Sequence, residues 1–100
     1  MRLKPGVRVL GIKPELLLAI MIAERAFHPN ELVITSLMDG THSRGSEHYT
    51  GMAFDARTRD VAESRAKELA HSIGAALGSD YDVILEPSHL HIEYDPKAPY

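Results

Sequence analysis

The chain contains no cysteine, and this absence limits the chemistry open to it. Disulfide bonds are excluded, and so is every structural zinc site built on thiolates. Any bound metal would have to be held by histidine, aspartate or glutamate, and the chain has six histidines. An excess of positive charge is also missing, since 11 Lys and Arg stand against 14 Asp and Glu. Nucleic-acid-binding domains usually present a basic face, so we expect no nucleic-acid partner.

Long hydrophobic runs are absent as well. The longest extends from Leu16 to Ala23 and is bounded by Glu15 and Glu24. A membrane-spanning helix needs about 20 apolar residues, so we expect no membrane span. The run also follows charged residues and two prolines, and no small-residue cleavage site comes after it, which argues against a signal peptide. We therefore predict synthesis in the cytoplasm without an export signal, and the oligomeric state stays open.

What the sequence does contain is typical of one small globular domain. Hydrophobic residues make up 44% and charged residues 25% of the 100 residues, an ordinary balance for a folded protein. We predict a single domain over residues 1–100 with a thin core, because a chain this short buries only about two thirds of its surface.

Hydrophobic periodicity predicts the first half of the fold. The expected elements are an edge strand at Val7–Leu10, a largely apolar core helix from Pro14 to Phe27, a strand at Leu32–Ser36, a polar loop at Asp39–Gly51 and a strand at Met52–Arg57. His28-Pro29 should end the first helix, because a residue before proline avoids helical dihedral angles.

The second half of the chain predicts a helix and a hairpin. Asp60 and Glu63 resemble an acidic capping box at the start of a helix, and Gly78 is a natural stop after it. Strands are expected at Tyr81–Glu86 and His89–Tyr94, joined by a tight turn at Pro87-Ser88. The whole pattern predicts a small α+β domain with a mainly antiparallel sheet and two principal helices.

The last predicted strand carries a histidine pair. Because side chains alternate along a strand, His89, His91 and Glu93 should share the face opposite to the apolar one. Two imidazoles in this arrangement suit a metal or catalytic site. A solvated hairpin face that merely carries these residues is the alternative interpretation.

A second cluster contains His42, His48 and Asp55. His48 lies in the predicted loop and Asp55 in the following strand, and Gly51 between them lets the backbone pass close by. The alternative interpretation is a polar loop in which Asp55 pairs with Arg57 or Arg59.

Taken together, the two clusters offer two histidines and one carboxylate. Catalytic zinc sites use such ligand sets and keep the fourth position for water. Non-haem iron(II) accepts the same ligands, so residue types alone do not choose the metal. Peptide hydrolysis at such a site also needs a base, and Glu86, three residues before His89, is the candidate.

Two motifs resemble those of a known family. The stretch from Ser46 to Asp55 matches the pattern S-x-H-x-x-G-x-A-x-D of the D-Ala-D-Ala metallopeptidases and their phage endolysin relatives. His89-Leu90-His91 matches the H-x-H motif of the same superfamily, which includes the Hedgehog signalling domain. The resemblance covers about residues 32 to 95 and implies a Hedgehog/DD-peptidase-like fold.

The resemblance also implies roles for individual residues. His48, Asp55 and His91 resemble the three zinc ligands of the family. Glu86 resembles the general base, and His89 a hydrogen-bond donor to the transition state. Two further residues would support the site: Ser46 would brace the loop, and His42 would contact water or substrate.

The sequence departs from the family pattern at Ser88. Many relatives have an acidic residue three positions before the last ligand, where this chain has serine. Glu86 stands three residues before His89, so an alternative register would make His89 the ligand. We prefer His91, because the H-x-H match agrees with the longer local pattern. Glu47, where phage relatives often have an apolar residue, is a second departure.

The predicted function is therefore a zinc peptidase that cleaves a peptide bond of bacterial peptidoglycan, as a carboxypeptidase or endopeptidase. The short chain resembles phage or prophage lysis enzymes, which act on the cell wall once released. The alternative is a zinc-containing binding module without turnover, as the Hedgehog resemblance allows.

Overall fold

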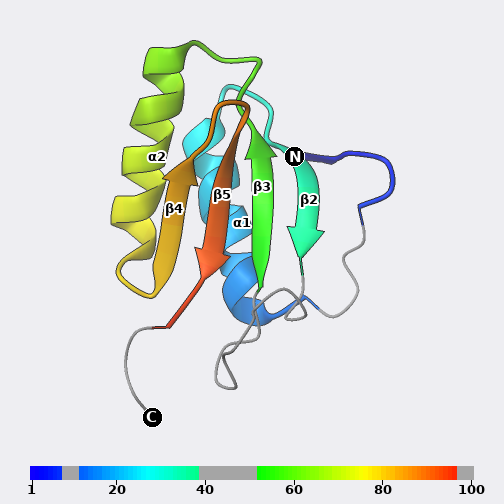
Figure 1. Cartoon of the computed structure of the whole chain (residues 1–100), viewed down its shortest axis with the longest axis vertical. Coiled ribbons are helices and arrows are strands. Elements are labelled where there is room, and N and C mark those ends of the chain that lie inside the picture. Colours follow the sequence, from blue (N-terminus) through cyan, green and yellow to red (C-terminus); the bar gives the residue numbers. More distant parts are fainter. Residues whose placement is uncertain (8–11, 39–51, 97–100) are drawn as a thin grey trace.

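Two helices and five strands make up a two-layer α+β domain in the computed structural model (Figure 1). The structure describes residues 1–7, 12–38 and 52–96. The sheet has the strand order β1-β2-β3-β5-β4. Its strands are β1 (Arg2–Leu3), β2 (Val33–Met38), β3 (Ala53–Arg57), β4 (Tyr81–Leu85) and β5 (His89–Tyr94). Among the described strands, only the β1–β2 pair is parallel, so the sheet is mainly antiparallel, as predicted.

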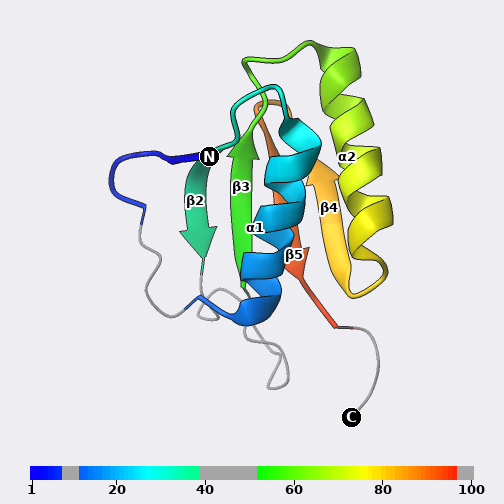
Figure 2. The ribbon, with the colours of Figure 1, turned by 180° about the vertical axis from the view of Figure 1, so that it is seen from behind.

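Helices α1 (Pro14–Phe27) and α2 (Glu63–Leu77) lie on the same face of the sheet. Figure 2 shows α1 crossing in front of the central strands and α2 running beside β4. The core lies between these two layers. Its largest fully buried side chains are Phe27, Phe54, Leu16, Leu32, Ile34, Leu69, Ile73, Leu90 and Ile92. Within the described residues, no helix is long and apolar enough to cross a membrane.

Helix α1 begins and ends where the sequence predicts. Pro14 occupies its first turn, where the missing N–H costs no hydrogen bond, and His28 follows its last residue. The prediction that this largely apolar helix lies in the core holds for one of its faces. Leu17, Leu18 and Met21 are 49%, 51% and 60% exposed, because only one face of the helix contacts the sheet and α2.

Helix α2 begins later than predicted. It starts at Glu63, and Ala62 precedes it without any side-chain cap. Asp60 does not cap the helix, because its carboxylate binds the Arg57 guanidinium at 2.7 Å. The predicted stop is confirmed, since Gly78 follows the last helical residue with a φ of 84°.

Residues 8–10 of the predicted edge strand Val7–Leu10 lie outside the described part of the chain, and Val7 belongs to no strand. Among the described residues, Arg2–Leu3 lies beside β2 and pairs with Val33 and Ile34. The predicted hairpin is confirmed, with the Glu86 N–H donating to the His89 carbonyl at 2.8 Å across the Pro87-Ser88 turn.

One glycine inside α2 and one directly after it give a matched test of the helix and its end. Gly74 lies inside the helix, and a Cβ there would meet Val83 at 3.9 Å, an ordinary contact distance. We expect Gly74→Ala to raise the free energy of unfolding by about 0.5–1 kcal/mol, because it reduces the freedom of the unfolded chain. Gly78→Ala should lower it by about 1–3 kcal/mol, because the backbone there suits only glycine. Urea unfolding of both variants checks the opposite signs, and equal effects would contradict the helix end described here.

Candidate metal centre

The candidate centre lies on the sheet face that points away from both helices (Figure 1). β3 and β5 lie next to each other in the middle of the sheet and pair in an antiparallel register. Phe54, Leu90 and Ile92 point into the core and are fully buried. Strand alternation then puts Asp55 and His91 on the opposite face.

Asp55 and His91 are direct cross-strand partners. Oδ1 of Asp55 lies 2.8 Å from Nδ1 of His91, which is a hydrogen-bond distance. Their side chains are 19% and 18% exposed, so the contact is largely shielded from water while remaining open on one side. Two residues that are 36 positions apart in the sequence are thereby brought to one point.

His89 flanks the same carboxylate from the next position on β5. It pairs with Arg57 across the strands, and its Nε2 lies 3.8 Å from Oδ2 of Asp55, too far for a hydrogen bond. Its Nδ1 lies 3.2 Å from Oγ of Ser88. Ser88, the residue that departs from the family pattern, therefore contacts the imidazole of His89.

The alternative in which Asp55 pairs with Arg57 is wrong. Nε and Nη2 of Arg57 contact Asp60 at 2.8 Å and 2.7 Å. Arg59, the other arginine considered, is exposed. Within the described residues, the Asp55 carboxylate instead lies between two imidazoles.

Glu93 is a second carboxylate partner of His91, and neither sequence motif assigns a role to it. Oε1 of Glu93 lies 2.9 Å from Nε2 of His91, so each ring nitrogen faces one carboxylate. Burial lowers the pKa of His91, but the hydrogen bonds to Glu93 and Asp55 outweigh it and raise that pKa above 6.5. The alternation of His89, His91 and Glu93 was a signal for this contact, because it predicted a shared face.

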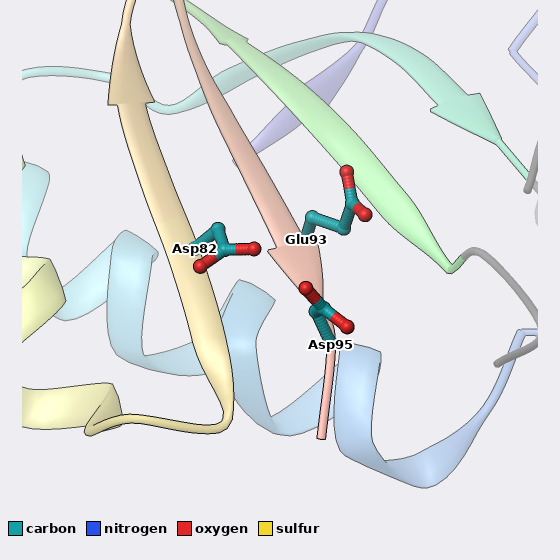
Figure 3. A group of neighbouring side chains, drawn as sticks. All are labelled: Asp82, Glu93 and Asp95. Carbon is teal, nitrogen blue, oxygen red and sulfur yellow. The ribbon is translucent and has the colours of Figure 1, made fainter. Parts of the chain in front are cut away.

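Glu93 also belongs to a group of three carboxylates with Asp82 and Asp95 (Figure 3). One oxygen from each lies within 4.8 Å of the others, and Asp82 is the cross-strand partner of Glu93. A ligand group made only of carboxylates suits Ca²⁺ or Mg²⁺ better than it suits zinc, which the site proposed from the motifs would bind through histidines. Exposed acidic groups are common without an ion, so this cluster alone does not define a site.

Glu86 follows β4 directly and stands opposite His89 in the hairpin. Its side chain is exposed and helps to line a hollow of about 440 Å³ that also includes Thr58, Arg59 and Glu63. No contact among the described residues joins its carboxylate to either imidazole. Its assignment as the base therefore stays a prediction.

Three predicted site residues, His42, Ser46 and His48, lie in the range 39–51 and so outside the described residues. The structure thus brings together Asp55, His91 and His89 but does not test the predicted third ligand, His48. The choice between His91 and His89 as a ligand also stays a prediction, although His91 lies closer to Asp55 by 1.0 Å.

The two nearest donor atoms fit a zinc ion chemically. Zinc bonds of about 2.0–2.1 Å at tetrahedral angles put two ligand atoms about 3.3 Å apart. Oδ1 of Asp55 and Nδ1 of His91 are 2.8 Å apart, so a shift of about half an ångström would accommodate the ion. The Nε2 contact with Glu93 matches the carboxylate partner that metal-binding histidines commonly have.

Comparisons of the chain with protein-family models, curated proteins and solved structures find no match.

The raised pKa of His91 predicts how the stability of the metal-free protein depends on pH. Because the folded state holds this proton more tightly than the unfolded state, His91 stabilises the fold fully below a pH of about 6.5. This contribution is lost as the pH rises through the raised pKa. Urea unfolding of chelator-treated wild type and His91→Gln should show a stability difference that shrinks with increasing pH. A difference that grows over the same range would contradict the two-carboxylate environment.

Proposed function

We propose that this chain is a zinc-dependent peptidase with a Hedgehog/DD-peptidase-like fold that hydrolyses a peptide bond in bacterial peptidoglycan. The observation that carries the proposal is the 2.8 Å contact between Asp55 and His91. These are two of the three residues that the motifs assign as ligands, and they come from different strands. A carboxylate and an imidazole aimed at one point, with a second imidazole beside them, form the donor set of catalytic zinc sites.

In this proposal Asp55, His91 and His48 hold the zinc ion. When bound, zinc supplies water of lowered pKa and polarises the carbonyl group that is attacked. His89 donates a hydrogen bond to the carbonyl oxygen as it gains negative charge. This role requires a proton on Nε2 of His89, and in that tautomer the Ser88 hydroxyl, 3.2 Å from Nδ1, donates to Nδ1.

Glu86 accepts the proton of the attacking water and passes it to the leaving amine. Its place at the end of β4, opposite His89, puts it at the same end of the hairpin as the proposed oxygen donor. The hollow beside it, lined by Arg59 and Glu63 among others, gives room for part of a peptide next to this end of the sheet.

The substrate class and the source follow from the resemblance. Peptidoglycan stem or cross-bridge peptides are the substrates of the metallopeptidases that share the two motifs, and either carboxypeptidase or endopeptidase action is compatible with them. A phage or prophage origin agrees with the similarity to short endolysins. The enzyme would be made in the cytoplasm and would reach the cell wall when released.

A zinc-containing binding module without turnover is the second candidate. It is favoured by Ser88, which replaces the acidic residue of many relatives, and by the exposed side chain of Glu86. In that case the centre would hold a peptide or wall fragment without cleaving it.

Glu86→Gln separates the two candidates. Purified zinc-loaded protein is incubated with cell-wall sacculi, and newly released amines are measured with and without a chelator. For a peptidase we expect amine release by the wild type, its loss with the chelator, and a decrease of about 10²–10⁴-fold in the variant at unchanged zinc content.

Glu68→Gln is the matched control, because Glu68 is 65% exposed on α2 and does not line this hollow. It should keep wild-type turnover. Zinc-loaded wild type that releases no amine would contradict the peptidase. Binding to sacculi that is unaffected by Glu86→Gln would then favour the binding module.

A further inference from the structure

Glu93 makes a contact that no ligand assignment explains. It follows His91 by two residues on β5, so both side chains leave the strand on the same face. Its Oε1 lies 2.9 Å from Nε2 of His91, while the other ring nitrogen faces Asp55. The side chain of Glu93 is 28% exposed, so the contact is partly shielded from competing water.

The chemistry of imidazole gives this contact a direction. A carboxylate only accepts hydrogen bonds, so Glu93 requires a proton on Nε2. Without a cation, Asp55 likewise requires a proton on Nδ1. The ring that is protonated on both nitrogens then donates a hydrogen bond to each carboxylate. Once a cation takes Nδ1, the remaining proton must lie on Nε2, where Glu93 accepts it.

We infer that Glu93 is the positioning residue of the centre: it holds His91 by Nε2–H, so that Nδ1 faces the cation beside Asp55. This inference rests on the proposed zinc site. Without Glu93 the ring would be free to turn about χ2, and either nitrogen could face the carboxylate of Asp55.

The neighbouring acidic residues do not account for the contact. Asp82, Glu93 and Asp95 bring three carboxylates within 4.8 Å, and like charges at this distance repel one another. A hydrogen bond from His91 offsets part of this repulsion at Glu93. The hydrogen bond between Glu93 and His91 is therefore favourable even when no ion binds the acidic group.

The first test uses the metal-free protein. NMR of chelator-treated protein at a pH at which His91 is protonated should show a downfield Nε2–H signal, protected by its hydrogen bond to Glu93. Glu93→Leu, which removes the acceptor, should abolish this signal. Asp82→Asn removes the neighbouring carboxylate and should leave it in place. A signal that persists in Glu93→Leu would overturn the inference.

The second test measures zinc affinity by competition with a chelator. We expect Glu93→Leu to weaken binding by about 10- to 100-fold, the usual effect of removing such a partner. Glu93→Gln keeps an acceptor oxygen and should lose less, and Asp82→Asn should bind as the wild type does. Ring ¹⁵N shifts of the loaded wild type should assign zinc to Nδ1.

The outcomes separate the inference from the proposed function. If the wild type binds zinc and Glu93→Leu binds it equally well through Nδ1, the inference is wrong and the zinc site stands. If the wild type binds no zinc although the Nε2–H signal depends on Glu93, the zinc function is wrong and the positioning of His91 stands. Equal losses in Asp82→Asn and Glu93→Leu would overturn the inference in favour of a cation bound by the acidic group.

Discussion

The register between β3 and β5 is the constraint on which the candidate centre depends. Asp55 stands opposite His91 because Phe54 pairs with Ile92 and Ala56 with Leu90. A shift of one residue in β3 would turn Asp55 into the core and bring buried side chains to the surface. The burial of Phe54, Leu90 and Ile92 therefore fixes the position of the polar pair on the other face.

In the two-layer architecture, the hydrophobic core and the candidate centre lie on opposite faces of the sheet. Both helices cover one face of the sheet, as Figure 2 shows for α1 and α2, and the core between the layers contains side chains from helices and strands alike. In the described part of the chain, the other face carries carboxylates and imidazoles on the central strands. Side chains on regular strands are held more firmly than side chains on loops, which favours a precise arrangement of donor atoms.

Electrostatics on this face depend on a balance around His91. One imidazole lies between Asp55 and Glu93, and the raised pKa reflects how strongly these carboxylates favour the protonated ring. A cation at the same point would replace the proton on Nδ1, and only Glu93 would then require a proton on the ring. A proton and a bound metal would therefore compete for one nitrogen, and the second nitrogen would keep its partner in both states.

Local patterns in the sequence determined the order of the main elements and the faces of the last strand. Alternation along β5 separated His89, His91 and Glu93 from Leu90 and Ile92, and Gly78 marked the end of α2, because these signals act between near neighbours. The motif resemblance assigned Asp55 and His91 to one centre, but only the tertiary structure decided that they are direct cross-strand partners. It also decided that Asp60 pairs with Arg57 and does not cap α2, and that Glu93 contacts Nε2 of His91. These contacts depend on strand register and on competition between partners, which no local spacing in the chain specifies.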